Sequence, residues 1–176
     1  MAQDLESIVV GQTGKVYNAP LGTAAPVDTA TAWAAGWIDL GTIFEDGLTT
    51  SFGEDTSDIK QWGGGVVRKL TTSSETTFQF IALESNAEVM ERFYRSAPSG
   101  GKVDIKGAVR DPRMWGIDIV DGDNHLRYVI ENGEITARGD VVYKADQAAS
   151  YDFTVTAYQD ANLVAATLYS DLASWT

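Results

Sequence analysis

Residues 75–94, ETTFQFIALESNAEVMERFY, place a half-buried strand directly before the most clearly marked helix of the chain. Within Glu75–Leu83, Phe78 and Phe80 fall on one face, while Thr77 and Gln79 fall on the other. An apolar–polar period of two is typical of a β-strand with one face against a core. We therefore expect a strand here whose aromatic face is buried.

The helix that follows has recognisable signals at both ends. Ser85 and Glu88 fit a capping box, with Ser85 as the N-cap and Glu88 at the third helical position. Apolar residues at helical spacing then form one stripe: Val89, Met90, Phe93 and Tyr94. Arg92 is expected to face water, and Pro98 with the glycines after it ends the helix. The prediction is a helix over about residues 85–95 that covers one end or face of a sheet.

Most of the remaining sequence favours short strands. The candidates are residues 9–19, 37–44, 66–72, 102–108, 114–120, 126–130, 135–144, 151–158 and 163–169. Tight turns are expected at Ser73-Ser74, Asp121-Gly122 and Asn132-Gly133. This pattern predicts a mainly β protein, an antiparallel β-sandwich or partly open barrel with one flanking helix. Residues 1–176 are expected to form a single domain in which residues 1–8 are a flexible arm.

One stretch, residues 45–65, interrupts this pattern. Its acidic residues precede any base, and it ends on Trp62 and three glycines, Gly63–Gly65. A structureless loop of more than about 12–15 residues is uncommon in a compact domain unless it has a function. We therefore expect a long early loop over about residues 45–65 and ask what it is for.

Composition excludes several classes of function. The net charge is −12, and residues 1–59 carry nine acidic residues and one basic residue. Such a surface disfavours nucleic-acid binding, which depends on neutralising phosphates. The absence of cysteine excludes disulfides and thiolate metal sites. The first residues lack a signal-peptide pattern and no apolar run approaches the roughly 18 residues of a membrane span, so no membrane anchoring is expected.

No constellation of residues indicates catalysis. The single histidine, His125, lies in a polar turn and is interpreted as a solvated turn residue. The run DGDN at residues 121–124 resembles the start of a calcium loop, but the remaining ligand spacing is not met. Gly63–Gly65 lack the spacing of a phosphate-binding loop. We predict no catalytic residue, no metal, no cofactor and no enzymatic activity.

Two interpretations of residues 45–65 remain open. In one, Phe52, Ile59 and Trp62 pack on the subunit's own core. In the other, the segment is mobile, hinged at Gly63–Gly65, and binds another copy. With no chemistry elsewhere for the segment to serve, the second is favoured, and the candidate assembly residues are Phe52, Glu54, Asp55, Asp58, Ile59 and Trp62.

The order of several segments resembles the major tail (tail tube) proteins of long-tailed bacteriophages, and in particular those of phages that infect actinobacteria. The segments are GKVYNAPLGTAAP (14–26), WIDLGTIFEDGL (37–48), DIKQWGG (58–64), TTFQFIALESNAEVMERFY (76–94), RYVIENGEITARGDVVY (127–143) and SYDFTVTAYQD (150–160). The resemblance covers most of the chain, and it rests on order and spacing rather than on one motif. Some relatives carry an additional C-terminal immunoglobulin-like domain, and we expect none within residues 1–176.

The resemblance implies a structural virion protein. Six copies would form a ring, and stacked rings would form a tube that conducts the genome into the host without binding DNA specifically. The implied partners are the protein itself, a tape-measure protein, and the tail terminator and tail-tip proteins. The implied location is the virion tail, and the host cytoplasm during assembly. Two alternatives are a tube protein of a related injection machine and a β-sandwich ligand-binding module.

Overall fold

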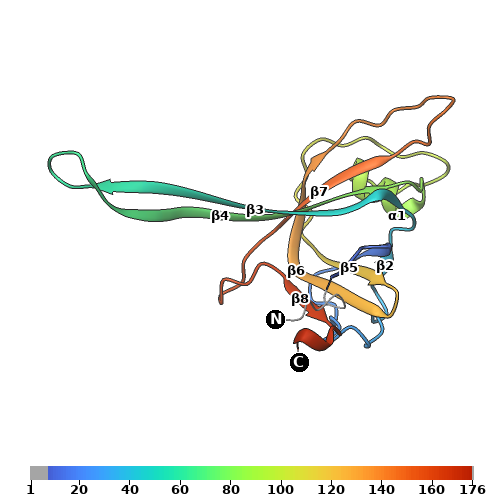
Figure 1. Cartoon of the computed structure of the whole chain (residues 1–176). Coiled ribbons are helices and arrows are strands. Elements are labelled where there is room, and N and C mark those ends of the chain that lie inside the picture. The colour runs from blue at the N-terminus through green and yellow to red at the C-terminus, as the bar shows by residue number, and fades with distance from the viewer. Residues whose placement is uncertain (1–7, 176) are drawn as a thin grey trace.

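The computed structural model describes residues 8–175 as one open antiparallel sheet of eight strands with one α-helix (Figure 1). The elements are β1 (Thr13–Ala19), β2 (Ile38–Asp39), β3 (Ile43–Lys60), β4 (Val66–Ala82), α1 (Ala87–Tyr94), β5 (Arg113–Asp121), β6 (Asn124–Arg138), β7 (Tyr151–Ala157), β8 (Thr167–Ser170) and the short 3-10 helix η2 (Ala173–Trp175). The strand order is β2-β1-β5-β6-β7-β4-β3, and β8 pairs with β6. The predicted mainly β class with one helix is confirmed. Seven of the eight residues of the expected N-terminal arm lie outside the described residues.

The long strand β6 joins the two halves of the sheet. Its first part pairs with β5 on one side and β8 on the other, and its last part pairs with β7. The turn expected at Asn132-Gly133 is therefore wrong, because the strand continues through both residues. A Cβ at Gly133 would lie 2.8 Å from Cδ1 of Trp115, so this glycine lets a large ring pack against the strand. The turn expected at Asp121-Gly122 is confirmed, since Asp121 pairs with Asn124 across a two-residue loop.

Two other strand predictions are wrong in extent. Residues 102–108 form no strand, and residues 139–144 continue as a loop after β6 ends at Arg138. Both segments contain apolar residues typical of strands, but several of these side chains lie in water: Ile105 is 76% exposed and Tyr143 is 72% exposed. Alternation alone does not make a strand when no neighbouring strand is in reach to pair with it.

Aromatic side chains from three elements fill the core. Phe80 of β4 stacks on Phe153 of β7 with ring centroids 5.4 Å apart. Phe93 of α1 meets Phe153 and Tyr151 edge to face, at 5.4 and 5.2 Å. Each such pair is worth about 0.5–1.5 kcal/mol beyond the area it buries. The strand and helix predicted over residues 75–94 thus pack as expected, with the helix covering the aromatic face of the sheet.

The helix begins one residue later than the capping box indicates. Asn86, not Ser85, is the N-cap, and its Oδ1 accepts a hydrogen bond from the Val89 amide at 2.9 Å. The Asn86 side chain also donates to the Leu40 carbonyl at 3.0 Å, so it ties the helix to the chain before β3. Ser85 instead forms a 2.9 Å hydrogen bond with the Tyr151 hydroxyl. Because Ser85 is hydrogen-bonded to Tyr151, the next polar residue, Asn86, caps the helix instead.

Arg92 is buried, which also differs from the sequence prediction. Its side chain is 4% exposed and is surrounded by carboxylates of Glu88, Glu91 and Asp111. Asp111 lies in the segment before β5, so its contact with the helix was not visible in local periodicity. A buried guanidinium is tolerated here because several acids compensate its charge.

The long acidic segment is not an irregular loop. Residues 43–60 form β3 and pair with β4 to make one long hairpin, with register shifts after Asp55 and after Ile59. Ser73-Ser74 is not a turn, because these residues pair with Asp55 and Glu54. Sequence periodicity missed the strands because residues 51–75 are exposed on both faces, which removes the apolar alternation. These strands are instead rich in Ser and Thr and are held together by continuous main-chain pairing.

A buried ion pair fixes the segment between β1 and β2. Arg127 of β6 donates to Asp118 of β5 at 2.6 Å, and the two side chains are 4% and 11% exposed. Arg127 also donates to the carbonyls of Asp28 and Thr31 at 2.8 and 2.6 Å. Trp33 stacks over the guanidinium and donates its indole N–H to Asp118 at 2.7 Å. The pair therefore anchors the segment of residues 20–37, which forms no helix or strand.

The cap predicts a measurable loss of stability at Asn86. Asn86→Ala should lower the free energy of unfolding by about 1 kcal/mol, because an amide of the first turn loses its acceptor. Asn86→Ser should cost less, since a serine hydroxyl can accept the same bond. Urea unfolding of the purified protein measures both changes. Equal losses in the two variants would contradict the capping role.

The buried ion pair predicts a larger loss than any exposed pair. Asp118→Asn should lower the free energy of unfolding by about 3 kcal/mol, because the buried Arg127 charge loses its counter-charge. The control is Lys15→Ala, which removes an exposed ion pair with Asp39 and should cost less than about 1 kcal/mol. Urea unfolding midpoints compare the two. Similar midpoints would show that Asp118 does not compensate a buried charge.

Candidate assembly interface

The β3–β4 hairpin projects far from the body of the protein (Figure 1). β4 pairs with β7 only from Thr76 to Ala82, so the outer part of the hairpin has no other strand beside it. Residues 51–75 are all exposed. The 13 residues from Leu48 to Lys60 span about 40 Å at the rise of an extended strand. This arm is held in shape by its own main-chain pairing and not by packing on the body.

The apolar residues predicted as assembly contacts all lie in water on this arm. Phe52 is 76% exposed, Ile59 is 47% exposed, and Trp62 is 106% exposed relative to its reference. The interpretation in which they pack on the subunit's own core is therefore wrong. They are not carried by a loop hinged at Gly63–Gly65 either, because these glycines form the turn at the end of the hairpin. Gly63 and Gly64 have φ of 117° and 98°, which favours glycine.

The six predicted residues do not form one cluster. Phe52 and Glu54 share the face of the hairpin that leads inward to Phe78 and Phe80, because paired and alternate positions lie on one face. Asp55 points to the opposite face, where its carboxylate accepts a hydrogen bond from the Ser73 hydroxyl at 2.8 Å.

Nearer the tip, Asp58 lies beside Lys69 at 3.9 Å, Ile59 is on the other face, and Trp62 sits in the turn. Most of the predicted residues are thus spread along the arm, and only Ile59 and Trp62 are near its tip.

The second strand of the arm carries residues that sequence reasoning missed. Val66, Val67 and Leu70 are 45–63% exposed and join Ile59 and Trp62 near the tip. The sequence predicted a strand over residues 66–72 but gave these residues no role in assembly. Charge also separates along the arm: residues 45–58 hold five acids and no base, while residues 60–72 hold three bases and no acid. This separation of charge is visible in the sequence, and it could have indicated that the end of the arm differs chemically from the rest of it.

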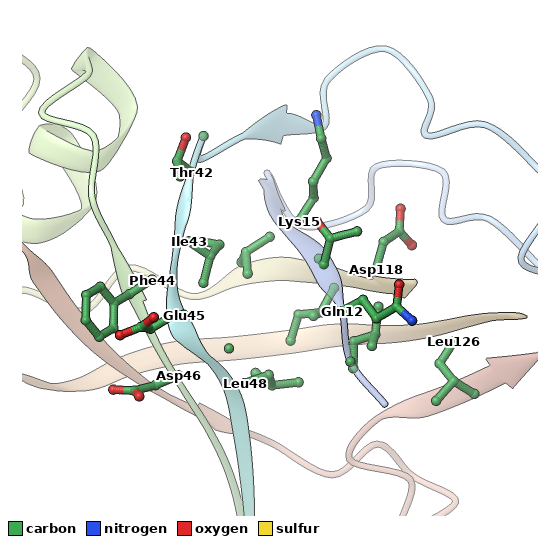
Figure 2. Close-up of a pocket in the computed structure, with 18 of the residues that line it drawn as sticks. Gln12, Lys15, Thr42, Ile43, Phe44, Glu45, Asp46, Leu48, Asp118 and Leu126 are labelled. Atoms are coloured by element: carbon green, nitrogen blue, oxygen red, sulfur yellow. The ribbon is translucent and has the colours of Figure 1, made fainter. Parts of the chain in front are cut away.

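A hollow lies at the root of the arm, where the sheet fails to close between β1 and the start of β3 (Figure 2). Its volume is about 860 Å³, and we call it the seam groove. Apolar residues of three strands and the start of β6 line it: Val16, Ile43, Leu48, Ile117, Ile119 and Leu126. Figure 2 shows Ile43 and Leu48 on the side of β3 that faces β1, while Glu45 and Asp46 lie on the opposite flank of β3.

The seam groove carries a negative charge at neutral pH. Its one lysine, Lys15, donates to Asp39 at 2.6 Å, and this contact raises the pKa of Lys15. Glu84 accepts two bonds from Thr42 at 2.8 Å, and these bonds lower the pKa of Glu84, so the carboxylate is ionised. Within residues 8–175, Glu45 and Asp46 have no hydrogen-bond or ion-pair partner. The flank of the groove therefore presents two uncompensated carboxylates.

The remaining candidates for chemistry have structural surroundings. His125 is in β6 rather than in a turn, and its Nε2 lies 3.3 Å from Oδ1 of Asp118 with the side chain 24% exposed. The interpretation of His125 as a solvated turn residue is wrong, since it belongs to the cluster around the Arg127 ion pair. Among the described residues, no group of three or more possible metal ligands is found. In the same part of the chain, no helix is long and apolar enough to cross a membrane.

Comparison with known proteins gives the context for this geometry. A family model described as phage tail tube protein matches residues 1–175. No curated protein matches the sequence. Two chains from solved structures of an extracellular contractile injection system share the fold. One, from the PVC sheath–tube complex in the extended state, is 11% identical, with 94% of each chain covered and a TM-score of 0.55. The other, from the sheath/tube terminator, is 13% identical, with 93% and 98% covered and a TM-score of 0.52.

The family match extends over almost the whole sequence. The chain belongs to the phage tail tube protein family.

Proposed function

We propose that the protein is the repeating structural subunit of a phage tail tube, and that six copies form a ring and rings stack into a hollow conduit for the genome. It is a structural protein and not an enzyme, as its family indicates. The observation that supports stacking most directly is the exposed arm with Trp62 at its tip. A folded monomer gains nothing from holding a tryptophan and several aliphatic residues about 40 Å from its core.

The arm is suited to a contact between copies, and this contact can repeat from copy to copy in one direction. The arm of one copy meets a different surface on the next, which is a heterologous contact. Heterologous contacts generate rings when they close and open filaments when they do not, and a tube of stacked rings needs both kinds. The predicted residues Phe52, Ile59 and Trp62 are the proposed apolar part of the inter-ring contact, with Glu54, Asp55 and Asp58 beside them on the arm.

Unpaired sheet edges supply a second surface for assembly. β3 ends the sheet on one side and the two-residue β2 ends it on the other. An exposed edge presents free main-chain donors and acceptors and promotes pairing with another chain. We infer that neighbours within a ring cover these edges, so that the single domain of residues 1–176 is completed by its copies. The six-fold symmetry rests on the resemblance to tail tube proteins.

The proposed partners and location follow from the same role. A tape-measure protein would occupy the tube during assembly in the host cytoplasm, and terminator and tail-tip proteins would close its ends in the virion. The net charge of −12 supports passage of DNA without specific binding. Repulsion by acids on the wall reaches only about 8 Å at physiological salt. The affiliation with phages of actinobacteria remains part of this proposal.

A tube subunit of a contractile injection machine is the second candidate. The fold similarity to chains of such a system supports it, although similarity at this identity concerns the fold alone. The two candidates differ in what the tube encloses. Particles that contain DNA and eject it support the tail tube, whereas particles that carry a protein cargo inside a sheath support the injection machine.

We expect Trp62→Ala to block tube growth without unfolding the subunit. Trp62 has no contact with the core, so the free energy of unfolding should change by less than about 0.5 kcal/mol. Loss of a central aromatic anchor typically costs about 2 kcal/mol of binding, so the critical concentration for tubes should rise by roughly 30-fold. Negative-stain microscopy and sedimentation across a concentration series measure this. Trp175→Ala, at another exposed tryptophan, is the matched control and should assemble normally.

A shortened arm gives a second test of the same role. Residues 53–75 can be replaced by an Asn-Gly turn, because Phe52 pairs with Thr76 and a two-residue turn closes such a pair. The variant should remain folded, as judged by circular dichroism and urea unfolding, and should not form tubes. Normal tubes from a folded variant that lacks the arm would overturn the proposed role of the arm.

A further inference from the structure

We propose that the tip of the β3–β4 arm binds in the seam groove of a second copy of this chain. This inference rests on the proposed function and identifies the surface that receives the arm. The tip comprises the turn at Gln61–Gly65 and the residues on both sides of it, from Ile59 to Leu70. The groove is the hollow between β1 and the start of β3.

The arm cannot reach the groove of its own subunit. The groove lies at the root of the arm, where Ile43 and Leu48 line it, and the tip lies about 40 Å away along paired strands. Main-chain pairing runs from Leu48–Phe80 to Lys60–Val66, so the arm cannot fold back without breaking its ladder. A tip that enters such a groove therefore belongs to another copy.

The apolar parts of the two surfaces match. Trp62, Val66 and Val67 at the tip are at least half exposed. The groove offers partly exposed apolar side chains of Ile43, Leu48 and Leu126, with a volume of about 860 Å³. Binding would remove both apolar surfaces from water, which is the main favourable contribution to protein association. A large aromatic side chain seated in such a pocket is a typical anchor of a protein–protein contact.

The charges of the two surfaces are complementary. Lys60 and Arg68 flank the tip, and within residues 8–175 neither side chain has a hydrogen-bond or ion-pair partner. Glu45 and Asp46 are unpaired in the same part of the chain and lie on the outer flank of β3, beside the groove (Figure 2). Basic residues that border an apolar tip can thus meet acidic residues that border an apolar groove. Complementary charges of this kind set register and orientation more than affinity.

A second hollow in the described residues fits the tip less well. It lies between the end of β7 and the segment before β8, and its volume is about 440 Å³. Its aspartate, Asp160, already accepts bonds from the amides of Asn162 and Val164 at 2.8 Å. Its other acid, Glu131, is a single free carboxylate among the described residues, so this hollow has a smaller volume and fewer unpaired acids than the seam groove, which is the better acceptor for a basic aromatic tip.

Docking in the seam groove fixes the geometry of assembly. Every copy then offers one tip and one groove, so contacts run head to tail in one direction. The offset between joined copies equals the distance from root to tip, about 40 Å. The length of the arm, and not a separate spacer, would set the repeat along the axis of the assembly.

Engineered cysteines test the contact directly, because the chain has none of its own. Lys60→Cys together with Asp46→Cys in one chain should give covalent ladders of subunits when assembled protein is treated with a short bismaleimide. The matched control pairs Lys60→Cys with Asp146→Cys, an exposed aspartate that does not line the groove, and should give no ladder. Ladders from the control, or tubes that give none with the test pair, would overturn the proposed site.

A charge exchange tests the pairing of tip and groove. Lys60→Glu with Arg68→Glu should lower the yield of tubes by about tenfold or more, because like charges then face one another at each contact. Glu45→Lys with Asp46→Lys should have the same effect. All four substitutions in one chain should restore most of the yield, as should mixing the two double variants.

The outcomes separate this inference from the proposed function. Restored tubes support the groove as the acceptor. If the unmodified protein forms tubes but the fourfold variant does not, the groove is not the acceptor of the tip. The proposed function as a tube subunit would then still stand. Failure of the unmodified protein to form tubes or rings, at high concentration and with a preformed tail tip as nucleus, would overturn both.

Discussion

The register of β4 against β7 is the constraint on which the rest of the structure depends. Phe78 and Phe80 pair with Val155 and Phe153, and these four side chains define the buried face. Because pairing is continuous along β4, the same register is carried outward through residues that contact no core. A shift of one residue would turn Phe78 and Phe80 into water and rotate the arm with them. The core therefore fixes where the arm points.

Sequence patterns predicted the elements that pack on this core. Alternation identified the strands around Phe78 and Phe153, and helical spacing identified α1, because burial on one face imposes these periods. The same reasoning failed where burial is absent or comes from distant residues. The arm has no buried face, Arg92 is buried by Asp111, and Ser85 is bound by Tyr151, far along the chain. Tertiary partners of this kind leave no local period.

Sequence reasoning singled out the acidic segment but did not predict that it forms one strand of a hairpin. Residues 45–65 were singled out as an assembly element, and Phe52, Ile59 and Trp62 are indeed exposed there. A strand over residues 66–72 was predicted, but its pairing with β3 and the exposure of Val66, Val67 and Leu70 were not. An isolated hairpin is barely stable in water, so a strand as exposed as β3 is not expected from propensity alone. Its pairing is sustained because β4 continues into the core.

An arm with a long free edge is also a hazard, since exposed edges pair with one another without specificity. The part of this arm between Glu45 and Asp58, which we call its stem, reduces that hazard. Its acids are concentrated between Glu45 and Asp58, so two stems laid edge to edge would bring like charges together. Register shifts after Asp55 and Ile59 interrupt the ladder and disfavour a second chain in flat register. The apolar residues are reserved mainly for the tip, where three bases attract an acidic surface and repel another tip. In the proposed assembly, this division disfavours contact between stems and leaves the tip exposed for the receiving surface.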